Sequence, residues 1–402
     1  MTGIYSGQKV TVVGQKQSAG QAADGSTLPS LAGTPQTLRL TGRSVNLEKN
    51  LLETEEIRSS RMQADVRHGF TTSSASLSYE LCVPSVGTPG DANTEYGQLM
   101  LIESVLEGVT ADAGITTLDT SGGTSTTALA FGDVVYEAGN AQVVYSAGTT
   151  QTSSISFSKV SDAAEINGAA YRAARYEIGN GATNAYVLER VFDRPTSSDD
   201  YVAEAFTNCV GNSLNISVSP ESIATGTTEF VGTHSLGMES NGTLTSATQL
   251  DNPVAPNSTP VYAAFDGAIF EGGTTGAATE LGIVTSVDFT VNNNRTTEAR
   301  IGSKFADCVF DATAQVEGTM TVFFNGATQY NKFVDETPAR LLVILRDPND
   351  AGACMAISCP NIKYNGGTID PPQEGPVTME MPFRALEGDN GESAIKIVNV
   401  HY

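Results

Sequence analysis

The chain has 402 residues and a net charge of −23, with 22 Lys and Arg against 45 Asp and Glu. So acidic a chain is a poor nucleic-acid binder, because affinity for DNA comes mainly from Lys and Arg that neutralise phosphates. It has no Trp, only 17% charged residues and 40 glycines, which favours short β-strands and small-residue loops over long helices. The length suggests two or three domains.

The cysteines lie far apart and show no CxxC spacing, which argues against a disulfide framework and a structural zinc site. They are Cys82, Cys209, Cys308, Cys354 and Cys359. We expect them to be small buried side chains of a protein in a reducing compartment. The N-terminus has no apolar core typical of a signal peptide, and no run approaches the ~18 apolar residues of a membrane span. The sequence therefore predicts a soluble protein made in the cytoplasm.

An internal duplication organises the chain. The matched segments are 41–48 with 285–291, 54–69 with 297–312, 73–81 with 316–324, 96–99 with 330–333, and 226–231 with 377–382. The apolar phase of the matched segments agrees: Leu77 and Tyr79 correspond to Met320 and Val322. A slip of one residue would exchange the two faces of a strand, so this agreement favours a true repeat.

Strands are predicted wherever apolar and polar residues alternate, as they do over 73–81, 214–218 and 287–291. Such strands have one apolar face and one solvated face. The best helix candidate is 95–107, which would pack on the apolar face of a sheet.

The domain organisation follows from the duplication. Residues 1–107 and 186–235 form a first, discontinuous domain, and residues 260–402 form a second domain. Between the parts of the first domain lies 108–185, a β-rich insertion without a counterpart in the second copy. Residues 236–259 resemble a linker between the copies.

No catalytic constellation is visible in the sequence. His68, His234 and His401 are far apart and resemble surface or loop residues, and there is no H-E-x-x-H, G-x-S-x-G or Walker A motif. Asp199 and Asp200 could bind a divalent cation with neighbours, but a solvated turn is the simpler interpretation. We therefore expect no enzyme activity, no cofactor and no metal.

Three blocks of sequence resemble the tail tube proteins, or major tail proteins, of long-tailed, siphovirus-like bacteriophages. The first has a Glu-Ile-Arg-Ser-x-Arg run, a basic Gly turn and a strand that ends in an acidic-apolar pair: Glu56, Ile57, Arg58, Ser59, Arg61, Arg67, Gly69, Glu80 and Leu81. The others are 186–194 with 205–232, and 282–293 with 318–333 and 377–386. The resemblance covers most of the chain outside 108–185.

The resemblance implies a mainly β fold: two tandem β-sandwich or barrel-like tube domains with short flanking helices, plus the β-rich insertion. It also implies rings of six domains around a channel, sheets that join side by side, and stacking through a long loop between early strands. The tube conducts DNA during ejection without binding it specifically. Implied partners are copies of the chain itself, the tape measure protein, and the tail terminator and tip proteins, with no membrane. The location would be the virion tail.

Two alternatives remain at this point. A self-assembling bacterial surface or secreted protein, such as an S-layer-like protein or an adhesin, suits the composition but should carry an export signal or anchor. A carbohydrate-active β-fold enzyme would display more aromatic platforms than 7% aromatic residues without Trp provide.

If each chain supplies two tube domains, three chains close a ring of six, so we expect a C3 homotrimer. Ring-stacking candidates are the charged residues of the two matched loops: Glu55, Glu56, Arg58, Arg61, Arg67, Arg295, Glu298, Arg300 and Lys304. A channel for DNA should carry carboxylates and hydroxyls rather than Lys and Arg. Lumen candidates are Glu48, Glu80, Glu229, Asp288, Glu317 and Glu380, with Ser76, Ser78, Thr319 and Thr321.

Overall fold

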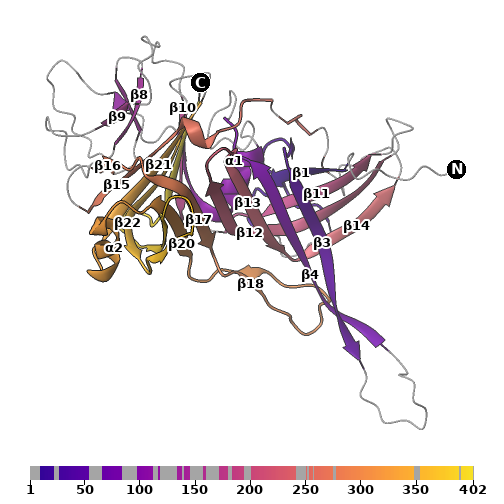
Figure 1. Ribbon diagram of the computed structural model, residues 1–402. Helices are drawn as coiled ribbons and strands as arrows, with labels where there is room; N and C mark the ends of the chain where they lie inside the picture. The colour runs from indigo at the N-terminus through magenta and orange to yellow at the C-terminus, as the bar shows by residue number, and fades with distance from the viewer. Residues whose placement is uncertain are drawn as a thin grey trace, which may run out of the picture.

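The fold is mainly β, as the sequence predicts (Figure 1). A computed structural model of the chain describes residues 10–21, 27–53, 66–83, 97–111, 116–117, 134–137, 140–144, 157–159, 172–179, 183–193, 201–240, 250, 253–256, 258–274, 278–347, 354–388 and 391–401. The named strands pair antiparallel except β6 (Thr116–Thr117) with β7 (Val134–Glu137). Antiparallel sheets can keep one face in the core and the other in water, which agrees with the alternation in the sequence.

The first half of the molecule is a sandwich of two sheets. Its elements are β1 (Val10–Lys16), β2 (Gln36–Thr37), β3 (Gly42–Glu53), β4 (Val66–Glu80), α1 (Gly97–Leu106), β11 (Tyr186–Asp193), β12 (Tyr201–Val218), β13 (Thr225–Gly232) and β14 (His234–Ser240). One sheet has the order β3-β4-β13-β12, and the other has the order β2-β1-β11-β12-β14. The long strand β12 runs through both sheets.

The second half repeats this order of pairing. Its elements are η2 (Ala264–Asp266), β15 (Gly267–Gly273), β16 (Thr279–Glu280), β17 (Val284–Asn292), β18 (Thr296–Thr297), β19 (Val309–Phe310), β20 (Gln315–Phe323), α2 (Ala327–Val334), β21 (Ala339–Arg346), β22 (Cys354–Tyr364), β23 (Thr368–Asp370), β24 (Thr378–Ala385) and β25 (Lys396–His401). One sheet has the order β17-β20-β24, with β22 and β23 beside β24. The other contains β15-β21-β22-β25.

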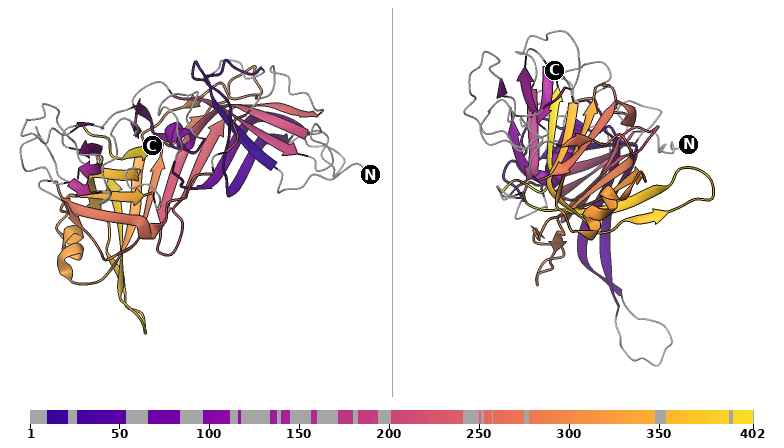
Figure 2. Two further views of the ribbon diagram at one scale, coloured as in Figure 1. Left: turned by 90° about the horizontal axis from the view of Figure 1, so that it is seen from above. Right: turned by 60° about the vertical axis from the view of Figure 1, so that its left-hand side comes forward.

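The two halves join edge to edge (Figure 2). Strand β12 of the first half pairs antiparallel with β17 of the second, from Ser213 opposite Asn292 to Val218 opposite Val287. The sheet therefore runs without a break from β3 to β24. One cluster of buried apolar residues also includes side chains of both halves, such as Leu77 and Met320. The two sandwiches consequently share one core.

Helix α1 is buried in the first half, within the range predicted for a helix. Every side chain from Gln98 to Leu106 is buried, and the helix contacts β12 and β10 (Arg172–Ile178). The close approach to β12 depends on Gly211, because a Cβ there would lie 2.7 Å from the Ser104 carbonyl oxygen. A helix that is apolar on most of its surface is stable only when it is covered in this way.

The insertion at 108–185 is more closely tied to the second half than the sequence suggested. Strands β7 and β8 (Asn140–Val144) lie within the segment that was expected to be rich in strands, and with β6 and β9 (Phe157–Lys159) they form a separate sheet. The two ends of the segment are not part of this separate sheet. Strand β10 pairs with β5 (Glu107–Ala111) on one side and with the C-terminal strand β25 on the other. The first half of the chain thus adds two strands to the second sandwich.

The expected linker at 236–259 is, in its described residues, part of the first half. It begins inside β14, which pairs with β12. Leu250 is buried against Val13 and Ala205, and Val254 exchanges backbone hydrogen bonds of 2.8 and 3.0 Å with Pro35 and Thr37. Its Ser, Thr and Asn content indicated a solvated connection, but a few apolar residues are enough to anchor it.

Most of the cysteines are buried, as expected. One histidine is also buried, which was not expected. Cys82, Cys209, Cys354 and Cys359 are buried, and burial raises the pKa of the Cys209 thiol to about 12. His234 is buried against the ring of Phe305 instead of lying at the surface. No helix among the described residues has the length and apolar character that crossing a membrane requires.

A buried carboxyl group lies in the β2-β1-β11-β12-β14 sheet of the first half. Glu189 of β11 pairs with Val13 and Ala205 on the neighbouring strands and is 1% exposed. Its Oε1 accepts a hydrogen bond of 3.4 Å from the backbone N–H of Leu250. Burial raises the pKa of Glu189 to about 7, and this hydrogen bond opposes the rise only in part. The protonated form of Glu189 is therefore favoured in the folded chain at pH values below about 7.

Replacing Glu189 with Gln is expected to stabilise the chain above neutral pH. Because the folded pKa lies above the unfolded one, wild-type stability should fall as pH rises from about 4.5 to about 7. The variant should escape that loss, which is at most roughly 3 kcal/mol. Urea unfolding across this pH range measures the difference, and parallel pH profiles for the two proteins would contradict it.

Candidate assembly surfaces

One face of the continuous sheet is polar across all of its strands. We call it the polar face: the surface of β3, β4, β13, β12, β17, β20 and β24 opposite the core. Neighbouring strands place Ser76, Glu229, Ser213 and Asn292 side by side. The alternate residues of the same strands, such as Leu77, point into the core. The period-2 alternation of each strand therefore produces one extended hydrophilic surface.

The strand register brings every lumen candidate onto the polar face. These residues are Glu48, Glu80, Glu229, Asp288, Glu317 and Glu380. Hydroxyl groups hold some of the carboxylates in place: Ser213 Oγ donates to Glu229 Oε2 at 2.8 Å and Ser74 Oγ donates to Glu48 Oε1 at 3.1 Å. The carboxylates are exposed or half-buried, so they remain hydrated.

The charge on the polar face is strongly one-sided. In the described strands Arg384 is the single Lys or Arg whose position in the register puts it on this face, although Arg39, which precedes β3, also reaches the face with Nη2 3.9 Å from Glu80 Oε2. The Nη1 of Arg384 lies 4.0 Å from Glu317 Oε1. Both side chains are well exposed, so this ion pair contributes little stability. Apart from a few apolar residues such as Phe323 and Pro382, the rest of the face consists of carboxylates, hydroxyls and amides. It would repel phosphate or leave it unbound.

The paired ends of β3 and β4, 49–53 and 66–70, project from the first sandwich (Figure 1). We call residues 49–70 the arm, of which 54–65 lie outside the described residues. Leu51, Leu52 and Val66 on the arm are large apolar residues with 53%, 57% and 41% exposure. Arg67 is exposed as well. The stacking candidates Glu55, Glu56, Arg58 and Arg61 lie outside the described residues. Apolar side chains exposed on a protruding element indicate a contact with another molecule.

The matching segment of the second half, 293–314, has a different arrangement. It folds back over the first half, where the ring of Phe305 stacks on His234 with centroids 4.1 Å apart. The backbone N–H of Thr71 donates to the Lys304 carbonyl at 2.9 Å. Val309 packs with Val210 in a small apolar cluster. This segment, which we call the clasp, therefore ties the two halves together.

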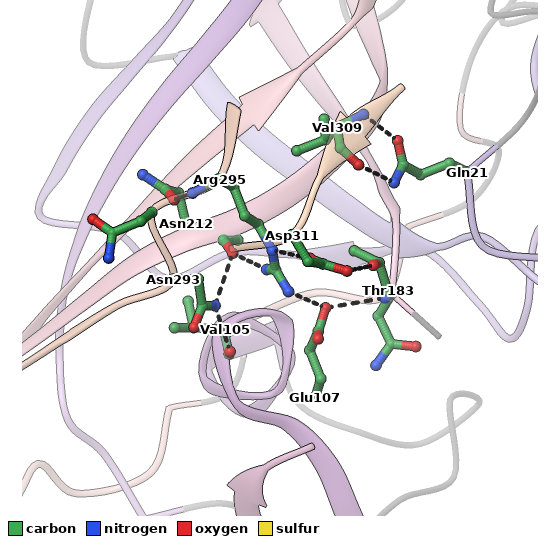
Figure 3. A network of polar contacts seen from close by, with 12 residues as sticks. Gln21, Val105, Glu107, Thr183, Asn212, Asn293, Arg295, Val309 and Asp311 are labelled. Carbon is green, nitrogen blue, oxygen red and sulfur yellow. Dashed lines mark hydrogen bonds and ion pairs between the residues drawn. The ribbon is translucent and has the colours of Figure 1, made fainter. Parts of the chain in front are cut away.

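Arg295 anchors the clasp (Figure 3). Its side chain is 3% exposed, with Nη2 2.5 Å from Glu107 Oε1 and Nε 2.7 Å from Asp311 Oδ1. Its Nη1 donates to the Gly211 carbonyl oxygen, and its backbone N–H donates to Asn212 Oδ1 at 2.7 Å. Burial raises the pKa of Glu107, and Arg295 opposes that rise.

Amide side chains complete the anchorage of the clasp. Asn293 Nδ2 donates to the Val105 carbonyl at the end of α1, at 2.8 Å. Gln21 Nε2 donates to the Val309 carbonyl at 2.8 Å, and the Val309 N–H donates to Gln21 Oε1 at 2.6 Å (Figure 3). Each of these bonds joins a residue of the clasp to the first half.

The expected stacking role of Arg295 is corrected by these contacts. A side chain that is buried and ion-paired within its own chain cannot also pair with another ring. The other candidates in the clasp are exposed: Arg300 Nη1 lies 3.0 Å from Asp307 Oδ1, and Glu298 and Lys304 face solvent. The turn at 298–304 thus remains available for contact with another molecule.

Sequence reasoning missed the partners of Arg295. Glu107, Asn212 and Asp311 come from three separate segments, and no spacing motif connects them. One signal for burial of Arg295 was present in the sequence. The residue of the arm that aligns with Arg295 is Leu52, an apolar residue. The alignment does not identify the residues that pair with Arg295.

Metal chemistry finds no support in the part of the chain that the structure describes. No group of three or more His, Cys, Asp or Glu side chains there could hold a metal ion. The acidic pair Asp199 and Asp200 lies outside that part. The candidate assembly surfaces of the described residues are the polar face, the arm, the turn at 298–304 and two sheet edges.

Comparison with known proteins agrees with this picture. A family model described as phage tail tube protein matches residues 7–385. No curated protein matches the chain.

Replacing Arg295 with Met should strongly destabilise the junction between the halves. The change leaves Glu107 buried without its cation, and breaking a buried pair in this way costs about 3–5 kcal/mol. Adding Glu107→Gln should recover part of the loss, because no buried charge then remains at that position. Urea denaturation of the wild type and both variants measures this, and a loss below about 1 kcal/mol for the single variant would refute it.

Proposed function

Because the chain belongs to the family of phage tail tube proteins, we propose that three copies close into a ring of six tube domains. The stacked rings would form a negatively lined conduit for DNA during ejection. Family membership makes the protein a structural component of the virion tail. The observation that carries the finer proposal is the β12–β17 junction, which joins two similar sandwiches edge to edge within one chain.

An internal duplication is supported by strand order as well as by sequence. Both halves place matched strands in the same pairing order, with β3, β4 and β13 corresponding to β17, β20 and β24. One detail of the sequence alignment needs a shift. Ala75 pairs with Phe230, and Gly318, its counterpart, pairs with Phe383. Phe230 therefore corresponds to Phe383, two residues beyond Met381, and a two-residue shift keeps each strand on the same face.

The junction within the chain suggests how neighbouring chains would join. Within the described residues β3 pairs with β4 alone, and β23 pairs with β24 alone. If the β12–β17 register is repeated between chains, Ile369 of β23 lies opposite Val45 of β3 in the next copy, as Ile216 lies opposite Phe289. Unpaired edges invite pairing of this kind. A head-to-tail contact closes into a ring when the rotation per step permits it.

The polar face is the surface that we assign to the channel. Its carboxylates and hydroxyls would let DNA slide without adhering, since binding requires cations that neutralise phosphates. In a closed ring the face continues from one chain to the next through the β3–β23 pairing. The opposite face cannot line the channel, because it forms the core of the sandwiches.

Ring stacking would use the exposed turn at 298–304 and the exposed charges of the arm, such as Arg67. Arg300 and Lys304 lie beside Ile301, which is fully exposed at the tip of the turn. Single exposed ion pairs contribute about 0–1 kcal/mol each, but a ring repeats every pair. Further partners in the tail would be the tape measure, terminator and tip proteins.

The edge pairing predicts that Ile369→Asp prevents ring formation. Ile369 is 38% exposed in the single chain, so the change should leave the fold intact, whereas in the ring it would bury a charge against Val45. Mass photometry should show trimers for the wild type and monomers for the variant. Val334→Asp, at a 57% exposed site on α2, is the matched control and should still form trimers. Trimers of Ile369→Asp would rule out the proposed register.

The channel assignment predicts the appearance of assembled tubes. A cryo-EM map should show threefold rings with Glu80, Glu229, Asp288 and Glu317 facing the lumen and the turn at 298–304 against the next ring. Arg300→Glu combined with Lys304→Glu should leave rings intact and shorten the tubes. A map with these carboxylates on the outer surface, or rings of six chains, would overturn the assignment.

A further inference from the structure

The second half carries an open cleft beside the polar sheet. Its volume is about 620 Å³. It is bounded by the start of β20, the end of β24, the end of β10 and the segment before β25. The residues that matter here are Ala314, Arg384, Glu387, Glu177, Glu392 and Ile178.

The corresponding place in the first half is filled by the clasp. The alignment of β4 with β20 makes Thr71 the counterpart of Ala314. The alignment of β13 with β24 makes His234 the counterpart of Glu387. Thr71 hydrogen-bonds Lys304, and His234 stacks on Phe305. The positions that receive the clasp in the first half therefore border the cleft in the second half.

The arm is the segment that matches the clasp. The ungapped alignment of 54–69 with 297–312 pairs Met62 with Phe305 and Val66 with Val309. Val309 is 3% exposed because it lies on the first half, whereas Val66 is 41% exposed on the projecting arm. Val309 is thus buried on a neighbouring sandwich, whereas Val66, the matching residue of the arm, is not.

We propose that the arm of each subunit docks in this cleft on the second half of the adjacent copy in the same ring. The inference rests on the proposed ring and deepens it. Met62 would lie at Glu387 as Phe305 lies at His234, and the N–H of Ala314 would donate to the Arg61 carbonyl. The proposed pairing of β3 with β23 of the adjacent copy determines which copy receives the arm. The arm continues from β3, and the cleft of the adjacent copy borders β24, which lies beside β23.

The charges of the cleft and of the stretch of the arm that would enter it are complementary. The cleft carries Glu177, Glu387 and Glu392 against Arg384. The stretch 57–62 of the arm carries Arg58 and Arg61 and no acidic residue. Complementary charges of this kind favour the correct partner and the correct register. The arm thereby has a contact within the ring, distinct from the turn at 298–304 that faces the next ring.

Cross-linking of isolated rings tests the proposal. Met62→Cys and Glu387→Cys are combined in a Cys308→Ser background, because Cys308 is the half-exposed thiol of the described residues. A short bis-maleimide should link the chains of a ring, so that covalent dimers and trimers appear on a denaturing gel. Met62→Cys with Phe265→Cys is the matched control. Phe265 is 82% exposed on the second half and does not line the cleft, so it should give no linked chains.

The outcomes separate this proposal from the one on which it rests. Linked chains in rings, before tubes form, support docking within the ring. Links that appear only after rings stack would overturn it, because the stretch around Met62 would then dock on another ring and not on the adjacent copy in its own ring. Wild-type rings without links in the variant would also overturn it and leave the ring proposal intact. A wild type that forms no rings would refute both proposals.

A second variant blocks the cleft without touching the arm. Ala314→Trp should raise the protein concentration needed for ring formation about tenfold, which corresponds to 1.4 kcal/mol. Ala327→Trp, at an exposed site on α2, is the control and should assemble normally. Unfolding curves of both variants confirm that the chains are folded. Normal assembly of Ala314→Trp would contradict docking of the arm in the cleft.

Discussion

The hydrogen-bonded junction between β12 and β17 is the constraint on which the rest of the structure depends. It aligns two sandwiches so that their polar strand faces become one surface and their apolar faces share one core. A sheet edge buried at a junction must have its backbone groups paired, and this pairing satisfies them. The clasp and Arg295 reinforce the same junction from one side. The polar face, both free edges and the cleft all take their positions from it.

Features set by local periodicity could be predicted from the sequence. The alternation of Leu77 and Tyr79 with Ser76 and Ser78 determined which side chains face the core, because side chains in a strand point to opposite faces in turn. The same rule placed all of the proposed lumen carboxylates on one face. Helix α1 was predictable from its apolar spacing. The strand pairing also agrees with the matched segments, apart from the two-residue shift at Phe383.

Features that depend on contacts between distant segments could not be predicted. Arg295 in a mixed-charge stretch suggested a solvated loop, whereas its side chain is buried and pairs with Glu107, which comes from another part of the fold. His234 had no sequence signal, because its neighbour Phe305 belongs to the second half of the chain. The insertion also gave no indication that β10 pairs with β25, since edge pairing uses backbone groups that every residue carries.

The exchange of segments between the halves has a consequence for how the chain folds. The first half sends β5 and β10 into the second sandwich, and the second half sends the clasp over the first. Strand β10 finds its partner β25 only when the end of the chain is present. Pairings at such long sequence separation slow folding, because loop-closure entropy is lost before the contacts form. The second sandwich, with its edge at β23 and its cleft, is therefore complete only after β25 has been made. A chain without β25 lacks a finished second sandwich.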